Sequence, residues 1–99
     1  MKQQVRAASI DQFREEEEEG KNARRRREVL AAIDSAETEW VSGRQMWKRC
    51  IELGYAHPPD DVYGSYQPRL NELVKAGLLE ESGERMECPV TGNRVTHYR

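Results

Sequence analysis

The stretch from Tyr63 to Glu81, YGSYQPRLNELVKAGLLEE, constrains the fold more than any other part of the chain. Its apolar residues recur at i, i+3, i+4 and i+8, the spacing that lines one face of a helix: Leu70, Leu73, Val74 and Leu78. Ser65 is the expected N-cap, Pro68 falls in the expected first turn, and Gly77 is placed to end the helix. The pattern predicts a helix of about three turns over residues 65–77 with a polar, exposed N-terminal end.

Two further helices and a short strand are predicted before this stretch. Apolar residues give residues 23–37 a core-facing stripe: Val29, Leu30, Ala32, Ile33 and Ala36. Ser42 is the expected cap of a second helix from Gly43 to Leu53, and Gly54 is expected to end it. Residues 38–41, TEWV, favour a short strand between the two helices. Trp40 and Trp47 are assigned to the core because a small domain depends on the large area that each buries.

A β-hairpin is predicted at the C-terminal end of the sequence. Polar and apolar residues alternate along 85–88 and again along 94–98, as they do in half-buried strands. Thr91, Gly92 and Asn93 lie between them and favour a turn. The prediction is a hairpin of residues 84–90 and 94–99, and therefore a mainly helical α+β domain.

Charge divides the chain into an arm and one domain. Residues 1–23 hold four Lys or Arg against six Asp or Glu, with five consecutive glutamates at 15–19. We expect an acidic arm there that is mobile or partly helical. Residues 24–99 hold twelve of each sign and form the predicted domain. Because this domain is neutral, a DNA-binding surface requires local clustering of arginines, such as Arg24–Arg27, rather than net charge.

The segment RLNELVKAGLLEE, followed by a charged hairpin, resembles the recognition helix and wing of small winged helix-turn-helix DNA-binding proteins of bacteria and phages. The ending TGNRVTHYR resembles that of phage-encoded members. The resemblance extends from about Arg24 to Arg99. It implies three helices plus a two- or three-stranded β wing, with a strand between the first two helices that pairs with the wing. It also implies sequence-specific binding of double-stranded DNA by a transcriptional regulator or a replication or accessory factor.

Residues for DNA contact are expected at the start of the third helix and on its flanks. Gln67 and Arg69 are expected to read bases, since Gln pairs with adenine and Arg with guanine. The supporting residues at this helix end are Ser65, Tyr66 and Tyr63. The expected contributors from the hairpin and the first two helices are Arg85, Asn93, Arg94, Arg44, Lys48, Arg24 and Arg25. DNA binding further requires Arg24–Arg27, Lys48, Arg69 and Arg94 to converge on one face.

A second interpretation is a winged-helix module that binds proteins and not DNA, since one fold serves many functions. That module would expose an apolar patch instead of a basic face. The acidic N-terminal arm is a candidate contact for a protein partner. A homodimer also stays open, although only residues 9–19 offer a separate helix for it.

Other classes of function find little support in the sequence. Four residues are the only soft metal ligands, and no CxxC or HxxxH pair starts a site: Cys50, His57, Cys88 and His97. We therefore expect no metal, no cofactor and no catalysis. No apolar run marks a signal peptide or reaches membrane-spanning length. The expected location is the cytoplasm of a bacterial host cell, with both thiols reduced.

Overall fold

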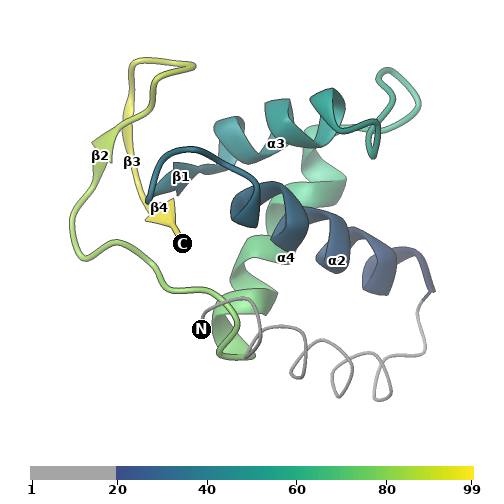
Figure 1. Cartoon of the computed structure of the whole chain (residues 1–99), viewed down its shortest axis with the longest axis horizontal. Helices are drawn as coiled ribbons and strands as arrows, with labels where there is room; N and C mark the ends of the chain where they lie inside the picture. The colour runs from purple at the N-terminus through teal and green to yellow at the C-terminus, as the bar shows by residue number, and fades with distance from the viewer. Residues whose placement is uncertain (1–19) are drawn as a thin grey trace.

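Three helices pack around a common core in the part of the chain that the computed structural model describes, residues 20–99 (Figure 1). The elements are α2 (Gly20–Asp34), β1 (Val41–Ser42), α3 (Gly43–Glu52), α4 (Tyr63–Lys75), β2 (Met86–Glu87), β3 (Arg94–Val95) and β4 (His97–Tyr98). Figure 1 shows α2 crossing α4, with α3 next to both and the β2–β3 hairpin at one side. This is the predicted mainly helical α+β domain. Most of the predicted acidic arm, including the helix considered for a homodimer, lies outside the described residues.

The first helix is displaced by three residues from the predicted range of 23–37. It begins at Gly20 because its first turn packs on α4, where Asn22 accepts a hydrogen bond from Arg69 and Ala23 is buried. It ends at Asp34, and the Ser35 hydroxyl then donates to the Ala32 carbonyl oxygen (2.9 Å). Such side-chain bonds compete with a helix for backbone groups. Residues 20–23 are therefore part of α2 in the structure.

The predicted boundaries of α3 are confirmed to within a residue. Ser42 Oγ accepts a hydrogen bond from the Gln45 amide (3.1 Å), and the Ser42 amide donates to Gln45 Oε1 (2.8 Å). This reciprocal capping box satisfies two backbone groups at the helix start. Gly54 has a φ of +79°, the left-handed conformation that was expected just after the helix.

The helix α4 begins earlier than predicted. Its first residue is Tyr63, and the N-cap position is held by Val62, which makes no side-chain capping bond; the prediction of Ser65 as the cap is wrong. Pro68 consequently lies inside the helix and not in its first turn. The extra turn forms because the Tyr66 side chain is fully buried beside Leu70 and Leu73, so the apolar face extends back towards the N-terminus.

The end of α4 is as predicted. Gly77 has a φ of +78°, and the amide of Leu78 donates to the Leu73 carbonyl oxygen (2.9 Å). Leu78 and Leu79 are both buried and belong to the core. The left-handed glycine therefore turns the chain back over the helix, and its two following leucines cover the end of the apolar face.

Two short antiparallel pairs join the strands. β1 pairs with β4 in the register Val41 to Tyr98 and Ser42 to His97, so the predicted pairing of a strand between the first two helices is confirmed. That strand covers residues 41–42 instead of 38–41. β2 pairs with β3, and the turn between them falls where it was predicted. The hairpin ladder is only two residues long on each side, shorter than predicted.

The core draws on all three helices and on β1 and β4. Its largest fully buried side chains are Tyr66, Leu30, Met46, Leu70, Leu73, Val29 and Val41. Trp47 packs against this core, as predicted, whereas Trp40 is half-buried at its edge with the Arg99 guanidinium 4.4 Å from its ring centroid. Cys50 and Cys88 are both buried free thiols on the inner faces where they were expected.

Two buried acidic groups of the core have raised pKa values. Burial, and secondarily the charge of Glu28, raises the pKa of the Cys50 thiol from 9.0 to about 12. Burial, followed by the hydrogen bond to Glu28, raises the pKa of the Tyr66 phenol from 10.0 to about 12. The folded protein therefore keeps both protons at pH values where the unfolded chain loses them.

The free energy of unfolding is expected to fall as pH rises from about 9 to about 12, because only the unfolded state gives up these protons in that range. Urea denaturation at several pH values above 9 measures the effect. Cys50→Ala should remove the part of the decrease in unfolding free energy that begins near pH 9. Tyr66→Phe should remove the part that begins near pH 10. A free energy of unfolding that is constant over this range contradicts the prediction.

Candidate functional site

A concavity of about 280 Å³ lies where α3, α4 and the β2–β3 hairpin meet, and we call it the hairpin cleft. Four residues predicted to contact DNA line it: Arg44 from α3, Tyr63 and Gln67 from α4, and Asn93 from the hairpin. Leu70 and Val95 are among its apolar lining residues. The folded chain thus brings together side chains that are up to 49 positions apart in the sequence.

Arg44 is held over the ring of Tyr63 at the cleft. Its guanidinium carbon lies 4.0 Å from the ring centroid, a favourable cation–π distance. Trp47 meets the same ring edge-on, with 6.2 Å between ring centroids. Gly43 makes room for this arrangement, since a Cβ there would collide with the Tyr63 hydroxyl. Burial raises the pKa of Tyr63, partly offset by Arg44, so the phenol is a neutral hydrogen-bond donor at pH 7.

The hairpin side of the cleft is fixed by backbone bonds. The Cys88 amide donates to the Asn93 carbonyl oxygen (2.8 Å), and the Gly92 amide donates to the Cys88 carbonyl oxygen (2.7 Å). These bonds close the turn and place Asn93 opposite α4. Among the described residues that line the cleft, Arg44 is the one Lys or Arg, and none is a carboxylate. The cleft therefore suits an anionic or polar ligand.

Cys88 connects the hairpin to the start of α3. Its Sγ shares a hydrogen bond with Ser42 Oγ (3.0 Å), the same hydroxyl that caps the helix. Burial by itself raises the pKa of this thiol, but bonds from Ser42, Thr91 and the backbone outweigh it and lower the pKa to about 7. The hairpin is thereby attached to α3 by a buried polar contact.

Two residues predicted to touch DNA face the interior instead. Tyr66 is 0% exposed, and its hydroxyl donates to Glu28 Oε1 (3.0 Å). The side chain of Arg69 is 12% exposed; it donates to Asn22 Oδ1 and pairs with Glu72 (2.9 Å). Both side chains hold α4 against α2 in this structure, whereas the sequence predicts that Arg69 reads bases and that Tyr66 supports it. The sequence does indicate that Tyr66 is buried, because Tyr66 precedes Leu70 by four residues and therefore lies on the same face of the helix.

The expected convergence of arginines on one face is also not found. Arg26 is 6% exposed and pairs with Glu72 (2.6 Å), next to Arg69. Arg24 is exposed and pairs with Glu28 (3.7 Å), and Arg25 lies over the Tyr66 ring with 5.7 Å to its centroid. The first-helix arginines thus divide between solvent and the contact with α4.

The remaining predicted residues lie at the surface or near it. Arg85 and Arg94 are exposed on the hairpin, where an Arg94 Nη2 group donates to the Arg85 carbonyl oxygen (2.8 Å). Ser65 is half-buried in the first turn of α4, and Lys48 is exposed on α3. Lys48 lines a different concavity from the one that Arg44 lines.

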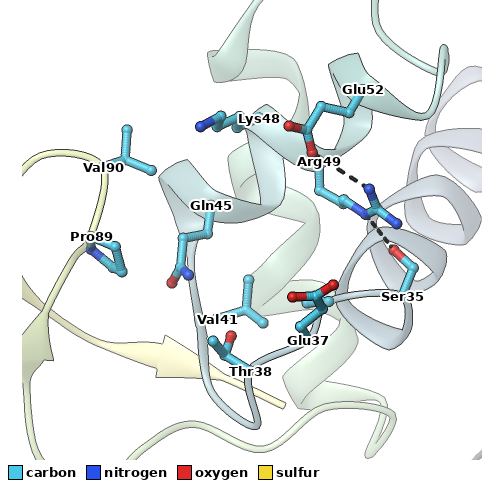
Figure 2. A pocket seen from close by; sticks show the side chains of 11 residues that line it. Ser35, Glu37, Thr38, Val41, Gln45, Lys48, Arg49, Glu52, Pro89 and Val90 are labelled. Atoms are coloured by element: carbon cyan, nitrogen blue, oxygen red, sulfur yellow. Dashed lines mark hydrogen bonds and ion pairs between the residues drawn. The ribbon is translucent and has the colours of Figure 1, made fainter.

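This second concavity, of about 560 Å³, lies between the end of α2, α3 and the hairpin turn (Figure 2). Figure 2 shows Lys48 and Arg49 on α3, with Pro89 and Val90 facing them from the hairpin. Arg49 is occupied, since it donates to Ser35 Oγ (2.9 Å) and pairs with Glu52 (3.5 Å). Val90 is 48% exposed, and sequence reasoning did not single it out. This surface has mixed charge and an apolar edge.

No protein-family model, curated protein or solved structure matches the chain. In residues 20–99, no three His, Cys, Asp or Glu side chains are grouped to hold a metal ion. None of the helices in that range is long and apolar enough to cross a membrane. The hairpin cleft is taken as the candidate site because four residues predicted to contact DNA meet there.

Proposed function

We propose that the chain binds double-stranded DNA as a winged helix-turn-helix protein, with α4 as the recognition helix and the β2–β3 hairpin as the wing. The structure does not show the convergence of first-helix arginines, Lys48, Arg69 and Arg94 on one face that the sequence analysis required for DNA binding, so the proposal rests on a smaller site. This site is the hairpin cleft, where Arg44, Tyr63, Gln67 and Asn93 meet without a carboxylate among the described lining residues. The order of elements supports it, since a strand pairs back between the first two helices and a hairpin follows the third. The sequence resemblance favours a phage or bacterial regulator or replication factor.

In this mechanism the exposed face of α4 enters the major groove and the hairpin contacts the neighbouring backbone. Arg44 contacts a phosphate, and Tyr63 both orients the guanidinium and donates from its hydroxyl. Arg85 and Arg94 supply cations on the hairpin, with Glu84 and Glu87 close to them in sequence. Phosphate contacts position a protein, and base-edge contacts give specificity. With a formal net charge of −2, binding depends on a few clustered cations, and log K should fall with log salt by about 0.9 for each phosphate that they contact.

The test is binding of the full chain to duplex DNA over a salt series, with Arg44→Ala. Loss of one phosphate contact is expected to lower the slope of log K against log salt by about 1 and to weaken binding on every sequence. Arg49→Ala is the matched control, because it removes the same charge from the other side of α3, where Arg49 pairs with Glu52. Equal effects of the two substitutions would show that only overall charge matters and that the cleft is not the contact.

A protein-binding module is the second candidate, and the concavity of Figure 2 favours it. Pro89 and Val90 give that concavity an exposed apolar edge at the hairpin turn, where a DNA-binding wing is usually polar. Absence of DNA binding at low salt, together with a well-folded protein, would reject the DNA proposal. This second candidate would then be pursued with Val90→Asp as the variant that disrupts docking.

A further inference from the structure

One face of α4 points to solvent along most of its length. Gly64, Asn71 and Lys75 are exposed, and Gln67 is half-buried where this face meets the hairpin cleft. Residues four apart lie on the same side of a helix, so Gln67 and Asn71 are neighbours on this face. The buried residues Tyr66, Leu70 and Leu73 occupy the opposite side of α4.

The two carboxamides on this face are not engaged within the domain. In residues 20–99, neither Gln67 nor Asn71 has a side-chain hydrogen bond to another described residue. The comparable groups of Asn22 and Gln45 are used internally, by Arg69 and by the cap of α3. Gln67 and Asn71 are thus the amide donors and acceptors that α4 keeps available for a partner.

We propose that Gln67 and Asn71 read two adenines of the target duplex in the major groove; the inference rests on the proposed DNA-binding function. A carboxamide presents one donor and one acceptor side by side, which matches N7 and the N6 amino group of adenine. Four residues of helix advance by about 6 Å, and stacked base pairs are about 3.4 Å apart. The two adenines should therefore lie within about three base pairs of each other.

Two further features of α4 agree with this assignment. Gly64 has no side chain, and a Cβ built at that position has no described atom within 4 Å, so the start of this face is open to close approach. The base-reading arginine expected from the sequence is absent from this face, because Arg69 pairs with Glu72 on the side towards α2. An adenine-based motif is thus expected from α4, without a guanine contact from Arg69.

The test is enrichment of binding sites from a random duplex pool by the full chain and by Gln67→Ala, Asn71→Ala and Lys75→Ala. The unmodified protein should enrich a motif with two A·T pairs within about three base pairs. Each amide variant should lose preference at one of these two positions, by about tenfold to a hundredfold in relative affinity, while keeping its affinity for random DNA. Lys75→Ala is the control on the same face: it removes a charge and should weaken binding without changing the motif.

Each outcome decides a different claim. If both amide variants enrich the same motif as the unmodified protein, the assignment of Gln67 and Asn71 is overturned and DNA binding stands. A chain that binds DNA but enriches no motif also overturns the assignment. If the unmodified chain binds no DNA at low salt, the proposed function fails and this inference fails with it. Circular dichroism of each variant tests whether the fold is kept, which is expected because none of the three substituted residues is buried.

Discussion

Replacing Tyr66 by alanine is expected to lower the free energy of unfolding by about 3–5 kcal/mol, the usual cost of removing a buried aromatic ring. The ring is 0% exposed and lies 5.3 Å from the Trp47 ring centroid, in the middle of the contact between α4 and the rest of the core. The free energy of unfolding of a small domain is about 5–15 kcal/mol in total, so this single substitution removes a large part of the stability. Urea denaturation followed by circular dichroism measures the loss.

The matched control is Tyr66→Phe, which keeps the ring and removes only the hydroxyl that donates to Glu28. Its expected effect is about 1 kcal/mol, the net value of one hydrogen bond. This pair of variants also separates the structural role from the one predicted by the sequence. If Tyr66 contacted DNA, Tyr66→Ala would weaken DNA binding and leave stability nearly unchanged, which would contradict the buried position.

Glu72→Gln is expected to destabilise the domain by about 2 kcal/mol, as for lost hydrogen bonds between charged groups. Glu72 accepts a hydrogen bond from Arg26 (2.6 Å) and forms an ion pair with Arg69 (2.9 Å) where α2 crosses α4. A glutamine keeps the shape but offers one acceptor for two guanidinium groups and removes the negative charge between them. The loss of unfolding free energy is large because Arg26 is buried. It stays below the loss expected for a fully buried ion pair, because Glu72 is 37% exposed and water screens its charge.

Glu80→Gln is the control for this substitution, since it removes one carboxylate charge from a solvent-exposed pair. Glu80 is 63% exposed and pairs with Arg99 (2.8 Å). Exposed ion pairs contribute little because water and salt screen them, so the effect should be a small fraction of that at Glu72. Urea denaturation of both variants at the same ionic strength makes the comparison. Equal losses would mean that the contact between Arg26, Arg69 and Glu72 does not hold the two helices together.

Helix caps and helix ends were predictable from the sequence, because they depend on residues that are close together in the chain. Ser42 caps α3, and Gly54 and Gly77 follow α3 and α4 in the left-handed conformation, because caps and terminating glycines act on backbone groups within one turn. The antiparallel pairing of β1 with β4 followed from the resemblance and was confirmed. Cys50 and Cys88 were assigned to inner faces by the periodicity of their elements, and both are buried.

The candidate site was predictable only in part. Arg44, Tyr63, Gln67 and Asn93 were singled out in the sequence, and the structure brings them into one cleft. Asn71 was not among the predicted contact residues of this helix, which all lie at positions 63–69. The start of a helix is set by what it packs against, and no local signal reports this.

The burial of Arg26 and Arg69 was not predictable from composition or periodicity. Arg26 is buried and Arg69 is mostly buried, because Arg26 reaches Glu72 across the helix crossing and Arg69 pairs with the same carboxylate from within α4. A charged residue is normally read as solvent-facing, since burial requires a partner. The identity of that partner depends on how α2 crosses α4, and this crossing is known only when the three-dimensional arrangement is known.

The pairing of Val41 with Tyr98 has a consequence for the rate at which the described domain folds. These two residues lie far apart in the chain, so the sheet between β1 and β4 forms only when a long loop closes. Contacts between residues that are distant in sequence slow folding, because the entropy of the loop is lost before the contact stabilises the fold. The pairing is therefore expected to make the domain fold more slowly than its helices alone would.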